Sequence, residues 1–189
     1  MIRIGILGDI GSGKSFVAQN FGYPVFNADQ EVAKLYQKDK DIFNKLKKKL
    51  PKYIHSFPVQ KKEISNAILS NDNNLTNIVK IIHLEIRKKM NIFLKKYKKS
   101  KIVILDIPLL LENKIDNKED ILVYVQSKKS KVLERLKKRK NFNQKLLDKF
   151  KTIQLSSTYK KKKSDHIINN NFTKKSVKDA IEDILKKVI

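Results

Sequence analysis

The chain has 189 residues, of which 40% are hydrophobic and 33% charged, and it contains no cysteine. This length suits one folded core with an inserted subdomain, and no apolar run approaches the roughly 20 residues of a membrane span. The absence of cysteine excludes disulfides and thiolate zinc sites, and we expect a cytoplasmic protein. The net charge of +24 could attract nucleic acid, anionic membranes or phosphorylated small molecules, but abundant lysine, asparagine and isoleucine indicate that much of it is compositional bias.

Short apolar runs alternate with amphipathic stretches along the chain. The first half is predicted to contain a strand at 2–7, a helix at 15–22, a strand at 23–29, and then mainly helices over 30–99 with a break at Pro51 and Pro58. The second half is predicted to contain strands at 101–108 and 120–126, helices at 130–140 and 143–155, a strand at 164–170 and a helix at 176–189. The four lysines at 160–163 lie between two patterned segments. The alternation predicts an α/β fold with a parallel sheet, whose ligands bind beyond the carboxyl ends of the strands.

Residues 8–15 read GDIGSGKS and match the full phosphate-binding loop pattern between a predicted strand and a predicted helix. Glycines at these positions let successive backbone N–H groups face one anionic centre. The Lys14 ammonium group can bridge the β- and γ-phosphate oxygens, and the Ser15 hydroxyl can be a ligand of Mg²⁺. The loop therefore predicts binding of a nucleoside triphosphate with Mg²⁺.

Two carboxylates stand at the ends of predicted strands. Asp29 could orient an attacking hydroxyl or accept its proton, or it could cap the helix that follows. Asp106 could hold Mg²⁺, or it could cap a turn before Pro108. Both alternatives stay open for each residue.

Two arginines stand four residues apart in a predicted helix, in a chain whose basic residues are almost all lysine. On one helix, Arg135 and Arg139 would share a face. Their guanidinium groups could then close over phosphates, or they could be two solvated side chains.

Taken together, these segments resemble the dephospho-CoA kinase family. GILGDIGSGKS resembles the family's phosphate loop, and FNAD followed by QEVAKLY resembles its DAD segment, with Asp29 at the second acid. The other matching segments, in chain order, are KKEISNAIL with Lys62 where arginine is usual, IIHLEIR with His83 and Arg87, LDIPLLLE with Pro108 to Glu112, ERLKKRK as the lid helix, and Gln154, Lys160, Asp165 and IINN near the C-terminus.

The resemblance implies a P-loop kinase fold in three parts: an ATP-binding core at about 1–30, 100–128 and 161–189, a helical CoA-binding insertion at about 31–99, and a lid at about 129–160. The implied reaction transfers the γ-phosphoryl group of ATP to the ribose 3′-hydroxyl of dephospho-CoA, with Mg²⁺ as cofactor. We expect a monomer or weak homo-oligomer with no specific nucleic-acid partner.

The resemblance also implies a role for each matching residue. The implied catalytic residues are Asp29, Lys14 and Arg139, and the implied Mg²⁺ ligands are Ser15 and Asp106. The implied ATP-binding residues are Gly11, Ser12, Gly13, Lys14, Ser15, Phe16, Arg135 and Asn170, and the implied acceptor-binding residues are Lys62, His83, Arg87 and Leu109.

The sequence departs from the family pattern at several of these segments. Asn27 replaces the first acid of DAD, Leu84 replaces the proline after the histidine, and Phe16 stands where threonine often follows the loop serine. Asp9 places a carboxylate inside the phosphate loop, where glycine is common. We expect the Asp9 side chain to face solvent or a nearby lysine, because it would repel a bound phosphate.

Two other functions are weighed against this one. A P-loop kinase for nucleoside monophosphates or shikimate would share the loop, but His83 and the PLLLE segment argue against it. A nucleic-acid-binding ATPase would explain the charge, but it needs a recognition module or an aromatic platform, and neither is recognisable in the sequence.

Overall fold

The computed structural model describes residues 1–189 and divides into two compact units. The sheet unit comprises Met1–Asn27, Phe93–Phe142 and Leu155–Ile189, and the helical unit comprises Ala28–Ile92 and Asn143–Gln154. Each unit is described by itself.

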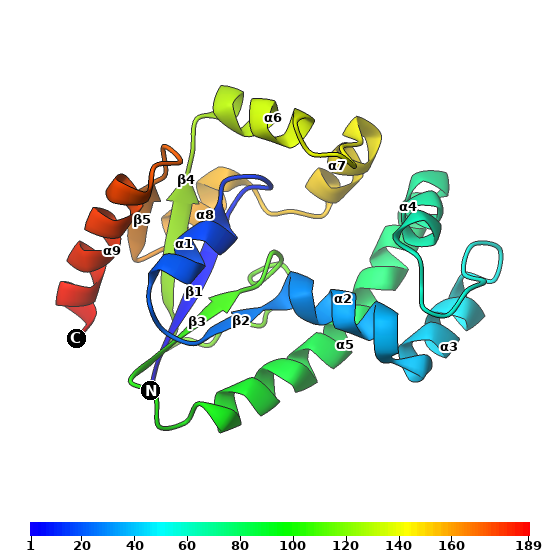
Figure 1. Ribbon diagram of the computed structural model, residues 1–189, viewed down its shortest axis with the longest axis horizontal. Coiled ribbons are helices and arrows are strands. Elements are labelled where there is room, and N and C mark those ends of the chain that lie inside the picture. Colours follow the sequence, from blue (N-terminus) through cyan, green and yellow to red (C-terminus); the bar gives the residue numbers. More distant parts are fainter. The chain divides into compact units, whose positions relative to one another are not determined.

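The sheet unit contains five parallel strands in the order β2-β3-β1-β4-β5. Its elements are β1 (Ile2–Gly8), α1 (Lys14–Asn20), β2 (Val25–Asn27), β3 (Ile102–Asp106), β4 (Ile121–Gln126), α6 (Lys129–Lys137), α8 (Ser157–Lys163), β5 (His166–Asn169) and α9 (Lys174–Val188), as labelled in Figure 1. Because β1 lies between β3 and β4, the strand order reverses at the carboxyl end of β1. This is the place where open parallel sheets bind ligands, and it is where residues 8–15 lie.

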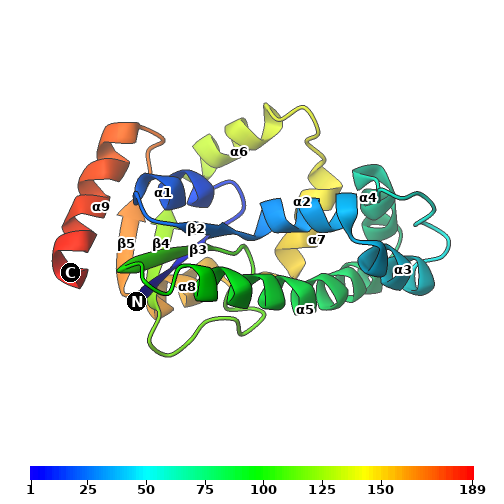
Figure 2. The same cartoon turned by 60° about the horizontal axis from the view of Figure 1, so that its bottom comes forward.

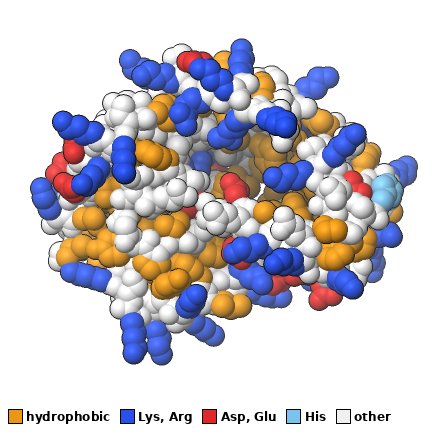
Figure 3. Space-filling model, in the orientation of Figure 1, with side chains coloured by type: hydrophobic (Ala, Val, Ile, Leu, Met, Phe, Trp, Pro, Cys, Tyr) orange, Lys and Arg blue, Asp and Glu red, His pale blue; other side chains and the backbone are white.

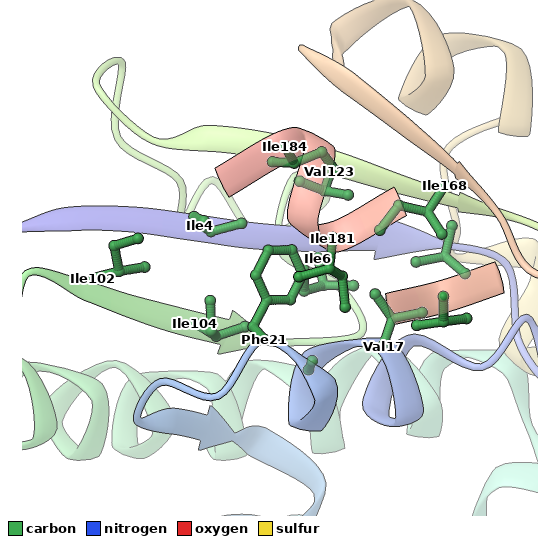
Figure 4. Packing of buried hydrophobic residues seen from close by; sticks show 13 residues of the cluster. Ile4, Ile6, Val17, Phe21, Ile102, Ile104, Val123, Ile168, Ile181 and Ile184 are labelled. Atoms are coloured by element: carbon green, nitrogen blue, oxygen red, sulfur yellow. The ribbon is translucent and has the colours of Figure 1, made fainter. Parts of the chain in front are cut away.

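One face of the sheet is covered by α1 and α9. Side chains alternate along a strand, so Ile4 and Ile6 of β1 point to the same face. There they pack against Phe21, which follows α1, and against Ile181 of α9, and all four are at most 3% exposed (Figure 4). The full cluster contains Ile4, Ile6, Val17, Ala18, Phe21, Ile102, Ile104, Val123, Val125, Ile168, Val177, Ile181 and Ile184. This packing holds α1 against the sheet, directly after the loop of residues 8–13.

The opposite face is covered partly by α8 and the turn after β3. Figure 2 shows α1 and α8 on opposite sides of the sheet. Tyr124 alternates with the core residues of β4 and therefore points to the α8 face. A Cβ atom on Gly5 would lie 2.7 Å from Leu110 Cδ2, so any larger residue here would force the Leu110 side chain to move.

The helical unit contains α2 (Ala28–Lys38), α3 (Lys40–Lys49), α4 (Lys61–Ser70), most of α5 (Asp72–Lys96) and α7 (Gln144–Thr152). Along α5, buried apolar residues recur every three or four positions, which is the spacing of one helix face. These residues are Leu75, Ile78, Ile82, Ile86 and Met90. The amphipathic stripe explains why this lysine-rich region folds into helices.

The structure confirms the predicted α/β class, all five strands and the helical character of 30–99. It also contains a helix that the sequence pattern does not predict, α8, where four consecutive lysines hide any apolar periodicity. The Ser156 hydroxyl caps this helix by accepting a hydrogen bond from the Tyr159 N–H at 3.1 Å.

The expected lid at 129–160 spans parts of both units, since α6 belongs to the sheet unit and α7 to the helical unit. A lid that moves as one body therefore stays a prediction. None of the helices combines the length and the apolar character that a membrane crossing requires. Figure 3 shows lysine and arginine side chains scattered over the visible face of the molecule.

Candidate active site

The phosphate loop lies between β1 and α1, as predicted. Its glycines Gly11 and Gly13 have φ values of +83° and +92°, in the region that favours glycine. A Cβ atom on Gly13 would lie 2.4 Å from the amide nitrogen of Asn170. Glycine is therefore required at position 13 both by the backbone conformation and by the close approach of Asn170.

The ammonium group of Lys14 lies over the start of this loop. Its Nζ donates hydrogen bonds to the backbone oxygens of Gly8 and Asp9, each at 3.0 Å. Ser15 follows Lys14 in the first turn of α1 and is half-buried, whereas Phe16 is 38% exposed. A cation held at this position can interact with phosphate oxygens that enter the loop.

Two side chains, one following β4 and one following β5, hold the phosphate loop through hydrogen bonds to its backbone. The backbone oxygen of Ser12 accepts hydrogen bonds from Ser127 Oγ at 2.9 Å and from Asn170 Nδ2 at 2.8 Å. The Asn170 side-chain oxygen Oδ1 accepts a hydrogen bond from the Phe172 N–H at 2.8 Å. The structure therefore places Asn170 at the loop, where its side chain holds the backbone of Ser12. The sequence offered only one signal for Ser127, its place at the end of a predicted strand.

Helix α6 lies against the same loop. A Cβ atom on Gly11 would lie 2.9 Å from Val132 Cγ1 and 3.0 Å from Leu136 Cγ, so these α6 side chains contact the loop backbone. The Arg135 guanidinium group of this helix lies 4.2 Å from the ring centroid of Phe172. This is a cation–π geometry, and it orients a charged side chain next to the loop.

Arg139, the second arginine of the expected lid, lies outside the helix that was expected to carry it. We predicted that Arg135 and Arg139 share one helix face, but α6 ends at Lys137. Arg139 lies in the turn beyond, where its N–H donates to the Leu136 oxygen at 3.1 Å. The shared face was therefore wrong, although both side chains are exposed.

At the ends of β2 and β3, Asn27 and Asp106 are paired in register. Asn27 Nδ2 donates a hydrogen bond of 2.6 Å to Asp106 Oδ2, and Asp106 is only 3% exposed. Asn27, which departs from the family pattern, thus supplies a neutral donor beside a buried carboxylate. An acid at this position would instead place two negative charges together.

The residues present fit a magnesium ion that arrives with a nucleotide. No group of three or more His, Asp or Glu side chains could hold a metal by itself. Mg²⁺ commonly uses one or two protein oxygens and completes its shell with phosphate oxygens and water. The Asp106 carboxylate and the Ser15 hydroxyl are oxygen donors of this kind.

Asp29 lies in the first turn of α2, because this helix begins at Ala28. The alternative in which Asp29 caps the helix from outside is therefore wrong. The residue is exposed and lies near the positive end of the helix dipole, where an acidic side chain is favourable.

The predicted acceptor residues lie mainly in the helical unit. His83 and Arg87 stand one turn apart on α5, and Lys62 is exposed in the first turn of α4. Burial, followed by the Arg87 charge, lowers the pKa of His83, and the His83 Nε2 atom is buried without a hydrogen-bond partner. The imidazole is therefore neutral near pH 7. Leu109 lies in the sheet unit, half-buried in the turn after β3.

The expected lysine partner of the Asp9 side chain was wrong. The residue is half-buried, and its carboxylate bonds to hydroxyl groups instead. Its Oδ2 atom accepts a hydrogen bond of 2.7 Å from Ser157 Oγ, and the Tyr124 hydroxyl lies 3.5 Å away. The sequence could not reveal these partners, because they come from β4 and from the unpredicted helix α8.

Comparison with known proteins agrees with this geometry. The family model for dephospho-CoA kinase matches residues 2–176. A dephospho-CoA kinase of Wolbachia pipientis wMel is 34% identical over 187 residues, which cover 96% of this chain and 95% of that protein. The crystal structure of TT1252 from Thermus thermophilus superposes with a TM-score of 0.80 at 23% identity, over 100% of this chain and 98% of that one. A dephospho-CoA kinase from Campylobacter jejuni gives a TM-score of 0.58 at 19% identity, over 98% and 96% of the two chains. The chain therefore belongs to the dephospho-CoA kinase family.

Proposed function

We propose that this chain transfers the γ-phosphoryl group of ATP to the ribose 3′-hydroxyl of dephospho-CoA, giving coenzyme A and ADP, the last step of coenzyme A biosynthesis. The observation that carries the proposal is the family match over residues 2–176, which includes the donor loop as well as the predicted acceptor segments. Catalysis of this kind depends on positioning and electrostatic stabilisation, since the protein forms no covalent bond to the phosphoryl group.

The donor half of the proposal is the phosphate loop. Backbone N–H groups of residues 11–15 would bind the phosphate oxygens, and the Lys14 ammonium group would neutralise charge on the transferring group. Arg135 and Asn170 would bind the nucleotide from α6 and from the loop before α9, and Phe16 would border it. Ser15 and Asp106 would hold Mg²⁺, which when bound polarises the phosphates and screens their charge.

The acceptor half begins with Asp29. Its carboxylate would orient the 3′-hydroxyl and accept its proton as the oxygen attacks the γ-phosphorus and the bond to ADP breaks. Lys62, Arg87 and the neutral His83 would bind the acceptor's polar groups. Leu109 would provide an apolar contact for the same substrate.

The segment at 129–160 is proposed as a lid that carries Arg139 to the transferring phosphoryl group. Water is itself an acceptor of phosphoryl groups, so a closed lid would prevent wasteful hydrolysis of ATP. A monomer or weak homo-oligomer acting in the cytoplasm belongs to the same proposal, as does the helical CoA-binding insertion at 31–99.

An ADP-release assay with a panel of acceptors tests the proposal. Dephospho-CoA, AMP, CMP and shikimate are offered separately with ATP and Mg²⁺, and the Lys14→Ala variant serves as the inactive control. Of these four acceptors, we expect only dephospho-CoA to be phosphorylated. Turnover with AMP or shikimate and none with dephospho-CoA would indicate another P-loop kinase, and ADP release that requires added nucleic acid would indicate an ATPase of that class.

A further inference from the structure

Asp9 places a negative charge inside a loop whose other features attract anions. The backbone oxygen of Asp9 accepts a hydrogen bond from Lys14 Nζ at 3.0 Å, so this residue lies directly beside the cation that would neutralise bound phosphates. A carboxylate near bound phosphates would repel them, since the interaction between two charges weakens only slowly with distance in a partly buried site. The chain therefore needs a way to control this charge.

The carboxylate is directed toward α8. The Ser157 hydroxyl, in the first residue of α8, donates a hydrogen bond of 2.7 Å to Asp9 Oδ2. The Tyr124 hydroxyl lies 3.5 Å from the same oxygen, and the Tyr124 residue is only 4% exposed. Burial and the neighbouring Asp9 charge raise the pKa of Tyr124, so its phenol stays neutral. Both hydroxyls lie on the face of the sheet that α8 covers.

We propose that Ser157 is a positioning residue for ATP: its hydroxyl holds the Asp9 carboxylate against α8 and so keeps this charge away from the bound phosphates. The inference rests on the proposed function in one respect, namely that the loop binds ATP. A hydrogen bond to an ionised carboxylate is short and stronger than one between neutral groups. It is therefore suited to fixing the direction of a single side chain.

The inference predicts a coupling between two residues. In Ser157→Ala the Asp9 carboxylate loses its short hydrogen bond and keeps only the 3.5 Å contact with the Tyr124 hydroxyl. It can then turn toward the phosphates, so we expect the Kd for MgATP to rise about tenfold. In Asp9→Asn the charge is absent and an amide oxygen still accepts from Ser157. In the Asp9→Asn background, Ser157→Ala should therefore change the Kd less than about twofold.

The experiment measures MgATP binding calorimetrically for the wild type, the two single variants and the double variant. Ser157→Thr keeps a hydroxyl and should retain wild-type affinity, and it provides a folded variant if Ser157→Ala does not fold. Ser156→Ala is the matched control, because Ser156 caps the same helix through the Tyr159 N–H. We expect it to lower the melting temperature and leave the ATP affinity unchanged. Added salt should reduce the Ser157→Ala penalty by screening the charge.

Three outcomes decide the matter. A Ser157→Ala penalty that disappears in the Asp9→Asn background supports the inference. An equal penalty in both backgrounds, or no penalty at all, overturns it while the proposed function stands. A wild-type protein that binds no ATP overturns the proposed function and this inference together.

Discussion

The Nζ atom of Lys160 lies 3.1 Å from Oε1 of Glu112, and the Lys160 side chain is 2% exposed. The same carboxylate oxygen accepts the Leu155 N–H at 3.0 Å. The Lys160 ammonium group is therefore buried, and Glu112 is the carboxylate that compensates its charge. This buried ion pair joins α8 to the turn that follows β3.

Removing one partner of this pair should be costly. In Glu112→Gln the buried ammonium loses its counter-charge, and we expect the free energy of unfolding to fall by about 3–5 kcal/mol. Urea titration followed by circular dichroism measures this. The double variant Glu112→Leu/Lys160→Met removes both charges and should lose less stability than Glu112→Gln alone. A Glu112→Gln variant as stable as the wild type would show that the pair is not the compensation that the geometry indicates.

Lys14→Ala should impair both nucleotide binding and turnover. The ammonium group that lies over the loop would no longer neutralise the phosphates, and we expect kcat to fall about 100- to 1000-fold with a raised KM for ATP. Steady-state kinetics measure both. Lys187→Ala, at an exposed position in the last turn of α9, makes the same change in net charge and should leave both constants unchanged. Equal effects of the two substitutions would contradict a specific role for Lys14.

Asp29→Asn should separate binding from chemistry. The amide cannot accept a proton, so we expect kcat to fall about 100-fold or more while the Kd for ATP changes less than about twofold. Glu31→Gln is the matched control, because Glu31 is also an acid in the first turn of α2. Near wild-type turnover by Asp29→Asn would reduce Asp29 to a contributor to the helix dipole interaction.

His83 should make stability depend on pH. Its folded-state pKa lies below the ordinary value of 6.5, so the unfolded chain binds more protons at this residue as the pH falls. The contribution to stability is complete above pH 6.5 and is lost as the pH falls through and below that value. Between about pH 7.5 and about pH 5, the wild type should therefore lose more unfolding free energy than His83→Gln. Parallel losses in the two proteins would show that His83 does not titrate in this way.

The sequence predicted most of the sheet unit because its signals are local. An apolar run such as 101–108 and a glycine loop such as 8–15 each determine their own backbone, and all five strands appear where the pattern indicated. By contrast, α8 was missed because its helix depends on the Ser156 cap and the burial of Lys160 against Glu112. That burial depends on a residue distant in sequence.

The candidate site was predictable in its motifs and unpredictable in its hydrogen bonds. The loop of residues 8–15 stands where the motif requires. The predicted partner of the Asp9 side chain was wrong, because the actual partner, Ser157, is 148 residues away in sequence. The shared face of the two lid arginines was also wrong, because α6 ends before Arg139. Such contacts depend on tertiary packing, which no local pattern specifies.

The most direct test of the central claim identifies the product. The protein is incubated with ATP, Mg²⁺ and dephospho-CoA, and the product is analysed by mass spectrometry and ³¹P NMR beside a reaction with the 3′-deoxyribose analogue of the acceptor. The proposed function predicts one phosphoryl group transferred for each ADP formed, present as a 3′-phosphomonoester, and no transfer to the analogue. A phosphoryl group at another position of the product would contradict it. So would ADP formation from ATP that is equally fast with the analogue and with dephospho-CoA.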